Sequence, residues 1–270
     1  SYYSVLKDRR VVSISIPRMV SGTTFYGPAS YSVMNHAGQA EFSGTIAITS
    51  SGISTALTGW IDEGEDDPIT ALDIGSLARM STNLYSESGY TLLESRAYFD
   101  IPASGDGTDG TNFDATQYGY DDMGRRWRTK DATGTISRQS FDSIGRPLAT
   151  YIGTNDSGFA GGEPSGTDDM VKVSETVYDT GATGGNSYVT KRTTFVEDST
   201  TDERVTDYTN DGRGRAVIIA PPAGPVILNK YDNFSRVVAV GQYSSTANIT
   251  VASDPTTETD DRIGLSQTFF

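Results

Sequence analysis

The chain has 270 residues with 35 acidic and 21 basic side chains, so its formal net charge is −14. It contains no cysteine, which excludes a disulfide framework and every cysteine-ligated zinc or iron–sulfur centre. The negative charge disfavours nucleic acid and anionic membrane surfaces as partners, and no run of about 18 apolar residues is present for membrane insertion.

Alternating patterns dominate the N-terminal part of the chain. Apolar and polar residues alternate over residues 11–16 and 45–49, which is typical of half-buried strands. The best helix candidate covers residues 69–80, although Gly75 interrupts it. We interpret residues 1–97 as a β-rich segment with degenerate repeats.

Trp60 lies next to the acidic stretch 62–67. An indole beside polar side chains offers a flat face for stacking on a sugar, so Trp60 is our candidate for carbohydrate binding. The simpler interpretation makes Trp60 a core residue and the acidic stretch a solvated loop. His36, the only histidine, is interpreted as exposed and inert.

Residues 105–114 are rich in glycine and aspartate. The carboxylates of Asp106, Asp109 and Asp114 are weak candidates for calcium ligands, because the spacing does not match an EF-hand and lacks its terminal glutamate. The glycines also have the spacing of a dinucleotide-binding loop, but the stretch opens no helix and its aspartates would repel a pyrophosphate. A solvated loop explains these residues more simply, and no cofactor is expected.

A repeat of 21 residues appears in the second half of the chain. An aromatic residue, aspartate, glycine and arginine recur with the same offsets in two successive copies. The first copy is Tyr120, Asp121, Gly124 and Arg125, and the second is Phe141, Asp142, Gly145 and Arg146. A further pair has the same interval, with Asp211, Gly214 and Arg215 followed by Tyr231, Asp232 and Arg236.

Weaker copies extend this pattern. Phe99 and Asp100 precede Tyr120 by the same interval, without a following Gly-Arg pair. Residues 34–39 resemble a decayed copy, and Tyr178-Asp179 has only its first half. Asp179-Thr180-Gly181 also has the letters of an aspartic-protease loop. That chemistry needs two carboxylates, and no second Asp-Thr/Ser-Gly occurs, so a repeat turn is the preferred interpretation.

Each residue of the repeat has an expected structural role. The aspartate accepts hydrogen bonds from amides two residues on, and the glycine takes the positive φ that completes the reversal. The arginine starts the next strand, where we expect it to reach a carboxylate on a neighbouring hairpin. The interval fits two strands with their turns, so each unit is a β-hairpin. We expect the aromatic residues to form an inward-facing column: Phe99, Tyr120, Phe141 and Tyr231.

These patterns predict an all-β protein built as an array of antiparallel β-hairpins, forming an extended, curled sheet or part of a shell. Residues 98–270 are interpreted as the regular array. Its spacers at 155–170, 180–206 and 241–266 exceed a regular repeat and are expected to be surface loops or extra hairpins.

The motif Tyr-Asp-x-x-Gly-Arg at 120–146 and 210–236 resembles the RHS/YD-repeat family. This resemblance implies a secreted or cell-surface bacterial protein in which the chain is a segment of a larger polypeptide, with a cargo domain enclosed in some members. It favours a non-enzymatic scaffold as the function. The alternative is a β module that binds a cell-surface glycan or partner, or that assembles with further copies of itself into a filament.

Overall fold

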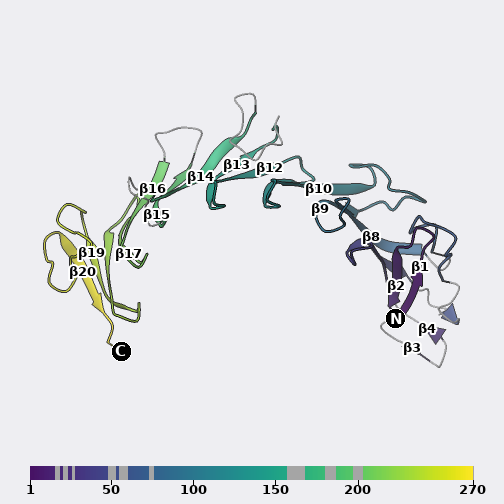
Figure 1. The fold of residues 1–270 in the computed structure, drawn as a ribbon, viewed down its shortest axis with the longest axis horizontal. Helices are drawn as coiled ribbons and strands as arrows, with labels where there is room; N and C mark the ends of the chain where they lie inside the picture. Colours follow the sequence, from purple (N-terminus) through teal and green to yellow (C-terminus); the bar gives the residue numbers. More distant parts are fainter. Residues whose placement is uncertain are drawn as a thin grey trace. The chain divides into compact units, whose positions relative to one another are not determined.

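The computed structural model describes residues 1–15, 19–20, 24–25, 28–47, 53–54, 60–72, 76–156, 168–179, 187–196 and 203–269 (Figure 1). All regular structure in these ranges is β-strand, as predicted, and none of them contains a helix able to span a membrane. The chain forms two compact units, residues 1–135 and 136–270. The predicted boundary at residue 97 marks where the repeats become regular, and does not coincide with this division.

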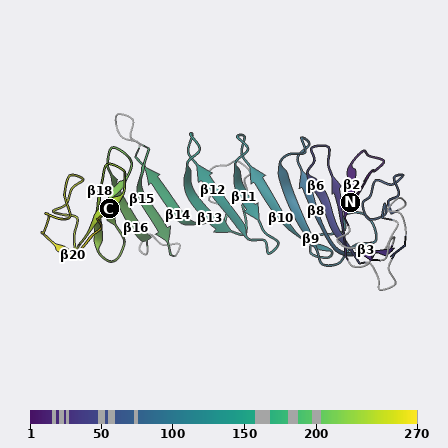
Figure 2. The ribbon, with the colours of Figure 1, turned by 90° about the horizontal axis from the view of Figure 1, so that it is seen from below.

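Unit 1 is built of antiparallel strands that pair in chain order, apart from a separate group of three. The paired strands are β1 (Tyr2–Val5), β2 (Val11–Ser15), β5 (Ala29–Met34), β6 (Ala40–Ala47), β8 (Ser76–Tyr85), β9 (Leu92–Tyr98), β10 (Phe113–Tyr120) and β11 (Arg126–Lys130). The separate group is β3 (Met19–Val20), β4 (Thr24–Phe25) and β7 (Ile53–Ser54). Figure 2 shows the consecutive strands side by side.

The helix candidate at residues 69–80 forms no helix in its described residues, in agreement with the all-β prediction. Residues 68–71 form a turn, and β8 starts at Ser76. β8 pairs with β6 on one side and β9 on the other. Pairing on both edges of the strand overrides the weak local helix preference.

The core of unit 1 lies between one face of its sheet and the segment 60–72. Trp60 is only 1% exposed and joins the buried cluster that contains Val12, Tyr31 and Phe42. The Tyr31 hydroxyl donates to the carbonyl oxygen of Pro68 at 2.8 Å, which fastens the segment to the sheet. The sugar-stacking role considered for Trp60 is therefore wrong, because its indole faces the core rather than solvent.

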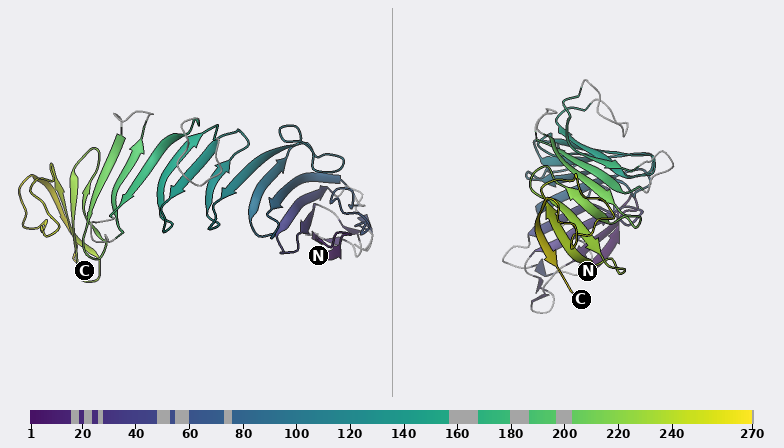
Figure 3. Two further views of the ribbon diagram at one scale, coloured as in Figure 1. Left: turned by 45° about the horizontal axis from the view of Figure 1, so that its top comes forward. Right: turned by 90° about the vertical axis from the view of Figure 1, so that its left-hand side faces the viewer.

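Unit 2 is a second antiparallel array, in which each strand pairs with the next in sequence (Figure 3). Its strands are β12 (Ile136–Phe141), β13 (Pro147–Gly153), β14 (Val171–Tyr178), β15 (Val189–Phe195), β16 (Glu203–Asn210), β17 (Ala216–Ala220), β18 (Val226–Tyr231), β19 (Val237–Tyr243) and β20 (Arg262–Gln267). The predicted array of antiparallel hairpins is confirmed.

Two of the long spacers have structural roles in unit 2. Within 155–170, the buried carboxylates of Asp156 and Asp168 lie 3.8 and 3.6 Å from the buried Arg138 guanidinium on β12. Within 241–266, Ile249 packs into the cluster around Leu228 and Tyr243, and β20 then adds a strand. The described residues of these spacers therefore pack against the sheet or extend it.

Candidate functional site

The aspartate of each repeat closes a five-residue turn. At Asp142, one carboxylate oxygen accepts the amides of Ile144 at 3.0 Å and Arg146 at 2.8 Å. The Asp142 amide donates to the Arg146 carbonyl at 2.9 Å, and the Gly145 amide donates back to the Asp142 carbonyl at 3.0 Å. Gly145 has a φ of 93°, a conformation that side chains disfavour. The carboxylate thus satisfies backbone donors that the reversal leaves open.

The same turn recurs at all four predicted repeats. The paired amide bonds to the aspartate Oδ1 measure 2.8 to 3.0 Å at Asp121, Asp142, Asp211 and Asp232. Gly124 and Gly214 have positive φ like Gly145, while the last copy has Ser235 at a φ of 64°. The backbone geometry is therefore kept even where glycine is not.

Each repeat arginine pairs with the aspartate of its own turn. The Nε-to-Oδ2 distance is 2.6 or 2.7 Å for Arg125, Arg146, Arg215 and Arg236. For Arg146 and Arg215, the expectation that the arginine reaches a carboxylate on a neighbouring hairpin is wrong, because the turn places the guanidinium beside its own aspartate four residues earlier.

Two of these arginines also reach the next hairpin, through a ring and a carbonyl. The Arg215 guanidinium stacks on Tyr231 at 4.7 Å and donates to the Asp232 carbonyl at 3.1 Å. The Tyr231 hydroxyl in turn donates at 3.0 Å to the carbonyl of Ala216, the residue after Arg215. We call this reciprocal contact the clasp.

A second clasp has the same form. Arg146 stacks on Tyr178 at 4.2 Å, and the Tyr178 hydroxyl donates to the Pro147 carbonyl at 3.1 Å. Arg146 also donates to the Ser187 carbonyl at 3.3 Å. The half-repeat Tyr178-Asp179 therefore supplies the tyrosine of a clasp, while Thr180 and Gly181 lie outside the described residues. Stacking of arginine on an aromatic ring adds about 0.5–1 kcal/mol at exposed sites.

The predicted inward aromatic column is only partly present. Tyr120, Phe141 and Tyr231 are half-buried at the strand ends. Phe99 is 61% exposed and its place in the column is wrong. The Phe99 and Asp100 amides both donate to the Asn112 carbonyl, at 3.0 and 3.1 Å, so this pair belongs to a loop. Tyr231 packs beside Arg215 at the end of its strand, where its ring stays half-exposed.

Two further turns form the same side-chain-to-amide hydrogen bonds, although the sequence pattern predicted neither as a full repeat. Asp131 accepts the amides of Thr133 and Thr135 at 2.9 and 3.0 Å, and Gly134 has a φ of 88°. Its signal was Asp-x-x-Gly without the aromatic or the arginine. In the decayed copy at 34–39, Asn35 accepts the amides of Ala37 and Gln39, both at 2.9 Å, with an amide oxygen in place of the carboxylate. His36 lies in this turn.

Part of the clasp also occurs beside the Asn35 turn. The side chains of Asn83 and Tyr85 both donate to the Ala40 carbonyl, at 3.0 and 3.4 Å. In unit 2, Asn229 and Tyr231 donate to the Ala216 carbonyl, at 3.1 and 3.0 Å. Both acceptors are the first residue of a strand that follows a repeat turn, so the two units share one design.

The turn carboxylates are held in the ionised form. Desolvation is the largest single influence on Asp121, Asp142 and Asp211 and raises the pKa, but the hydrogen bonds from backbone amides and arginine together outweigh it. The pKa of each is therefore lowered. At Asp232 the amide of Arg236 is the largest influence, and the pKa is lowered as well. Such carboxylates act as fixed hydrogen-bond acceptors rather than as proton carriers at neutral pH.

The three calcium candidates do not converge. Asp106 lies 3.1 Å from the Arg96 guanidinium, Asp109 bridges to Phe113 through its backbone, and Asp114 is exposed on β10. Within the described ranges no three acidic or histidine side chains group as metal ligands would.

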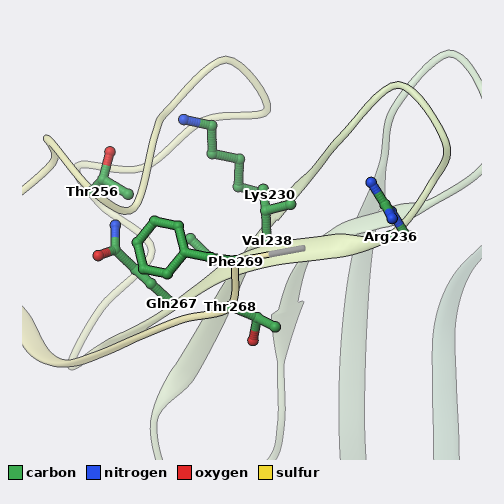
Figure 4. A pocket seen from close by; sticks show the side chains of 8 residues that line it. Lys230, Arg236, Val238, Thr256, Gln267, Thr268 and Phe269 are labelled. Atoms are coloured by element: carbon green, nitrogen blue, oxygen red, sulfur yellow. The ribbon is translucent and has the colours of Figure 1, made fainter.

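A shallow pocket of about 290 Å³ lies beside the end of β20 (Figure 4). Lys230, Arg236, Val238 and Phe269 are among its lining residues. The Lys230 ammonium pairs with Asp254, and this hydrogen bond is the largest influence lowering the pKa of Asp254 to about 2. Its two cations are thus already neutralised, since Arg236 pairs with Asp232.

Comparisons with known proteins gave matches among solved structures only. No family model and no curated protein matches the chain. A crystal structure of TcdB2-TccC3 without its hypervariable C-terminal region is 12% identical over 90% of this chain, with a TM-score of 0.40. A Tc holotoxin pore from Photorhabdus luminescens is 14% identical over 81% of this chain, with a TM-score of 0.39. The chain spans 11% and 10% of those chains, about a tenth of their length.

Proposed function

We propose that this chain is a non-enzymatic structural scaffold, a segment of an RHS/YD-repeat sheet within a larger secreted or cell-surface polypeptide. The observation that carries the proposal is the recurrence of the aspartate turn, with arginine and tyrosine fastening one hairpin to the next. Regular contacts between neighbouring hairpins, rather than one central cleft, are typical of repeat proteins that serve as frameworks.

The use of the charged residues supports a scaffold. The most regular carboxylates of the chain, Asp121, Asp142, Asp211 and Asp232, are each committed to two backbone amides and one arginine. A general acid or base needs a pKa near the working pH, whereas these pKa values are lowered away from it.

The partners follow from this role. The first partner is the remainder of the same polypeptide, and the second is a cargo domain enclosed by the repeats. The alternative of glycan binding is not supported, because Trp60, the candidate for stacking on a sugar, is only 1% exposed.

The test is the structure of the native polypeptide, first sequenced by mass spectrometry and then imaged by cryo-electron microscopy. We expect further hairpins with the same turn to continue the array, and R146A to increase protease cleavage of the intact polypeptide. D260A is the matched control, because the Asp260 carboxylate is exposed and forms no ion pair with a described residue. The proposal fails if the native protein turns over a substrate at a carboxylate of this chain whose substitution leaves the fold intact.

A further inference from the structure

The sheet of unit 1 has a second face, opposite to the one on which the segment 60–72 packs. Phe42 on β6 and Met80 on β8 belong to the buried cluster of the first face. Because side chains alternate along a strand, the neighbours of these two residues lie on the second face. Two directly opposed pairs of β6 and β8 are placed there: Ser43 with Ser81, and Thr45 with Arg79.

An open hollow of about 430 Å³ lies on this second face, over β6, β8 and β9, which are side by side in Figure 2. The four residues of the two pairs line it, together with Ala97 of β9, which is opposite Ser81. Its lining also includes Gly44, Met80 and Tyr98, whose positions along the strands belong to the first face, so they contribute backbone atoms. The floor of the hollow is therefore formed by backbone and small side chains.

The polar side chains of this hollow are not used within the described chain. The hydroxyls of the two pairs and the Arg79 guanidinium form no hydrogen bond or ion pair with a described residue. Arg79 is exposed, whereas Arg10 and Arg96 of the same unit each pair with a carboxylate. Although the chain has 35 acidic residues, none of those that the structure describes lines the hollow. The hollow thus offers one positive charge that no neighbour neutralises.

These groups fit a ligand that has both a carboxylate and several hydroxyls. The planar guanidinium of Arg79 matches the two oxygens of a carboxylate. Serine and threonine hydroxyls donate and accept hydrogen bonds, as the hydroxyls of a sugar do. Asp114, exposed one strand beyond Ala97 on the same face, adds an acceptor for a sugar hydroxyl. A peptide strand would instead need open backbone groups, which lie at the edge of a sheet and not at its centre.

The hydroxyls continue beyond the hollow in one direction. Ser43 is opposite Ser32 of β5, and Ser32 is opposite Ser13 of β2. Opposite residues have Cβ atoms about 4.5–5.5 Å apart, so the serines form a row that runs across the strands. A saccharide longer than one ring would therefore find a polar surface for its further rings, starting from the hollow.

We propose that this hollow binds a carboxylated saccharide. The Arg79 guanidinium pairs with the carboxylate, and the hydroxyls of Ser43, Thr45 and Ser81 contact the hydroxyls of the ring. This activity goes beyond the scaffold role, since an array of hairpins needs no ligand on this face. It also places saccharide recognition on a different surface from the one that Trp60 suggested.

Three small probes separate the parts of such a ligand. Glucuronate has the ring and the carboxylate, glucose has the ring alone, and acetate has the carboxylate alone. Each is titrated into the ¹⁵N-labelled 270-residue chain, and the amide NMR signals of Gly44 and Met80 are followed. We expect glucuronate to shift these signals to saturation and to bind several-fold more tightly than either acetate or glucose.

Two variants test the residues of the hollow. R79Q should weaken glucuronate binding at least tenfold. T45V, which removes a hydroxyl at nearly constant volume, should weaken glucuronate binding several-fold and leave acetate binding unchanged. R9Q is the matched control, because Arg9 is exposed outside the hollow and its side chain forms no ion pair with a described residue.

Three results would overturn the proposal: no saturable shift with glucuronate, glucuronate binding no tighter than acetate, or equal weakening by R9Q and R79Q. The same NMR spectra show whether each variant is folded, and T45V decides the question if R79Q is not. None of these results bears on the scaffold proposal, which is tested separately by the protease cleavage of R146A.

Discussion

The Arg215 guanidinium lies 4.7 Å from the ring centroid of Tyr231, and the Tyr231 hydroxyl bonds the carbonyl of the residue after Arg215. Each residue therefore holds the hairpin to which the other belongs. The contact joins two strands, β17 and β18, for which only two opposed residue pairs form the ladder. The side chains of Arg215 and Tyr231 therefore help to hold the two strands together where few backbone pairs do so.

The first prediction separates the hydroxyl of the clasp from its ring. Y231F should lower the free energy of unfolding by about 1 kcal/mol, the usual net value of one hydrogen bond. R215A should cost more, about 1.5–3 kcal/mol, because it removes hydrogen bonds to a charged partner. Urea unfolding measures both. Y90F is the control, since Tyr90 is 70% exposed, and equal losses in Y90F and Y231F would contradict the clasp.

The second prediction concerns the turn carboxylate. D142A should lower the free energy of unfolding by about 1 kcal/mol, because the Ile144 and Arg146 amides lose their acceptor. D260A removes an exposed carboxylate outside a repeat turn and should change stability little. If the urea unfolding midpoint of D142A equals that of the wild type, Asp142 does not stabilise the turn.

The third prediction concerns the positive φ at the turns. S235G should stabilise the protein by about 1 kcal/mol, because Ser235 has a φ of 64° and glycine adopts this conformation without strain. G124A should destabilise by a similar amount, about 1 kcal/mol, since Gly124 has a φ of 76° in open space. G212A is the control, because Gly212 has no positive φ and no neighbour within 4 Å.

A fourth prediction distinguishes two glycines with the same backbone conformation. Gly214 and Gly124 have φ of 79° and 76°, but a Cβ at Gly214 would overlap the ring of Tyr188. G214A should therefore destabilise more than G124A, and G214A combined with Y188A should recover part of the difference. Thermal unfolding of the three variants checks this order, and a smaller loss for G214A than for G124A would rule out the ring contact.

The fifth prediction is an acid-dependent loss of stability. The turn aspartates and Asp254 have pKa values lowered by folding, so their contribution is present above the unfolded value of about 3.9 and is lost as the pH falls through the folded values. For Asp254 the window runs from about pH 4 to about 2. D254N should flatten the curve of unfolding free energy against pH in this window, and an unchanged slope would show that the Lys230 pairing does not persist in solution.

The sequence predicts well those features that are encoded by a few neighbouring residues. The turn around Asp142 is encoded by three neighbours, namely the aspartate, the glycine and the arginine, so the pattern is visible without any distant contact. The alternation of the strands then fixes the hairpin array. Even the decayed turn at Asn35 follows this local chemistry.

What the sequence does not predict depends on distant segments. Trp60 is buried because the segment 60–72 packs on strands that begin at Val11, Ala29 and Ala40, and nothing beside Trp60 encodes that cover. The partner of Tyr178 is Arg146, across the long segment 154–170, so the regular 21-residue spacing conceals it. The exposure of Phe99 has the same origin, since its loop breaks the repeat at Asn112.

The clasp has a consequence for how such a chain can change over generations. In unit 2 it connects β13 to β14 across the long segment 154–170, and it connects β17 to β18 across the short turn 221–225, in the same way. The connecting segment leaves each strand at the end opposite to the clasp. Its length is therefore free to vary, provided that residues such as Asp156 and Asp168 still reach Arg138, while the clasp maintains the alignment of the strands. The strand ends that bear the connecting segments can accumulate sequence differences, whereas the strand ends that bear the clasp must keep its arginine and tyrosine.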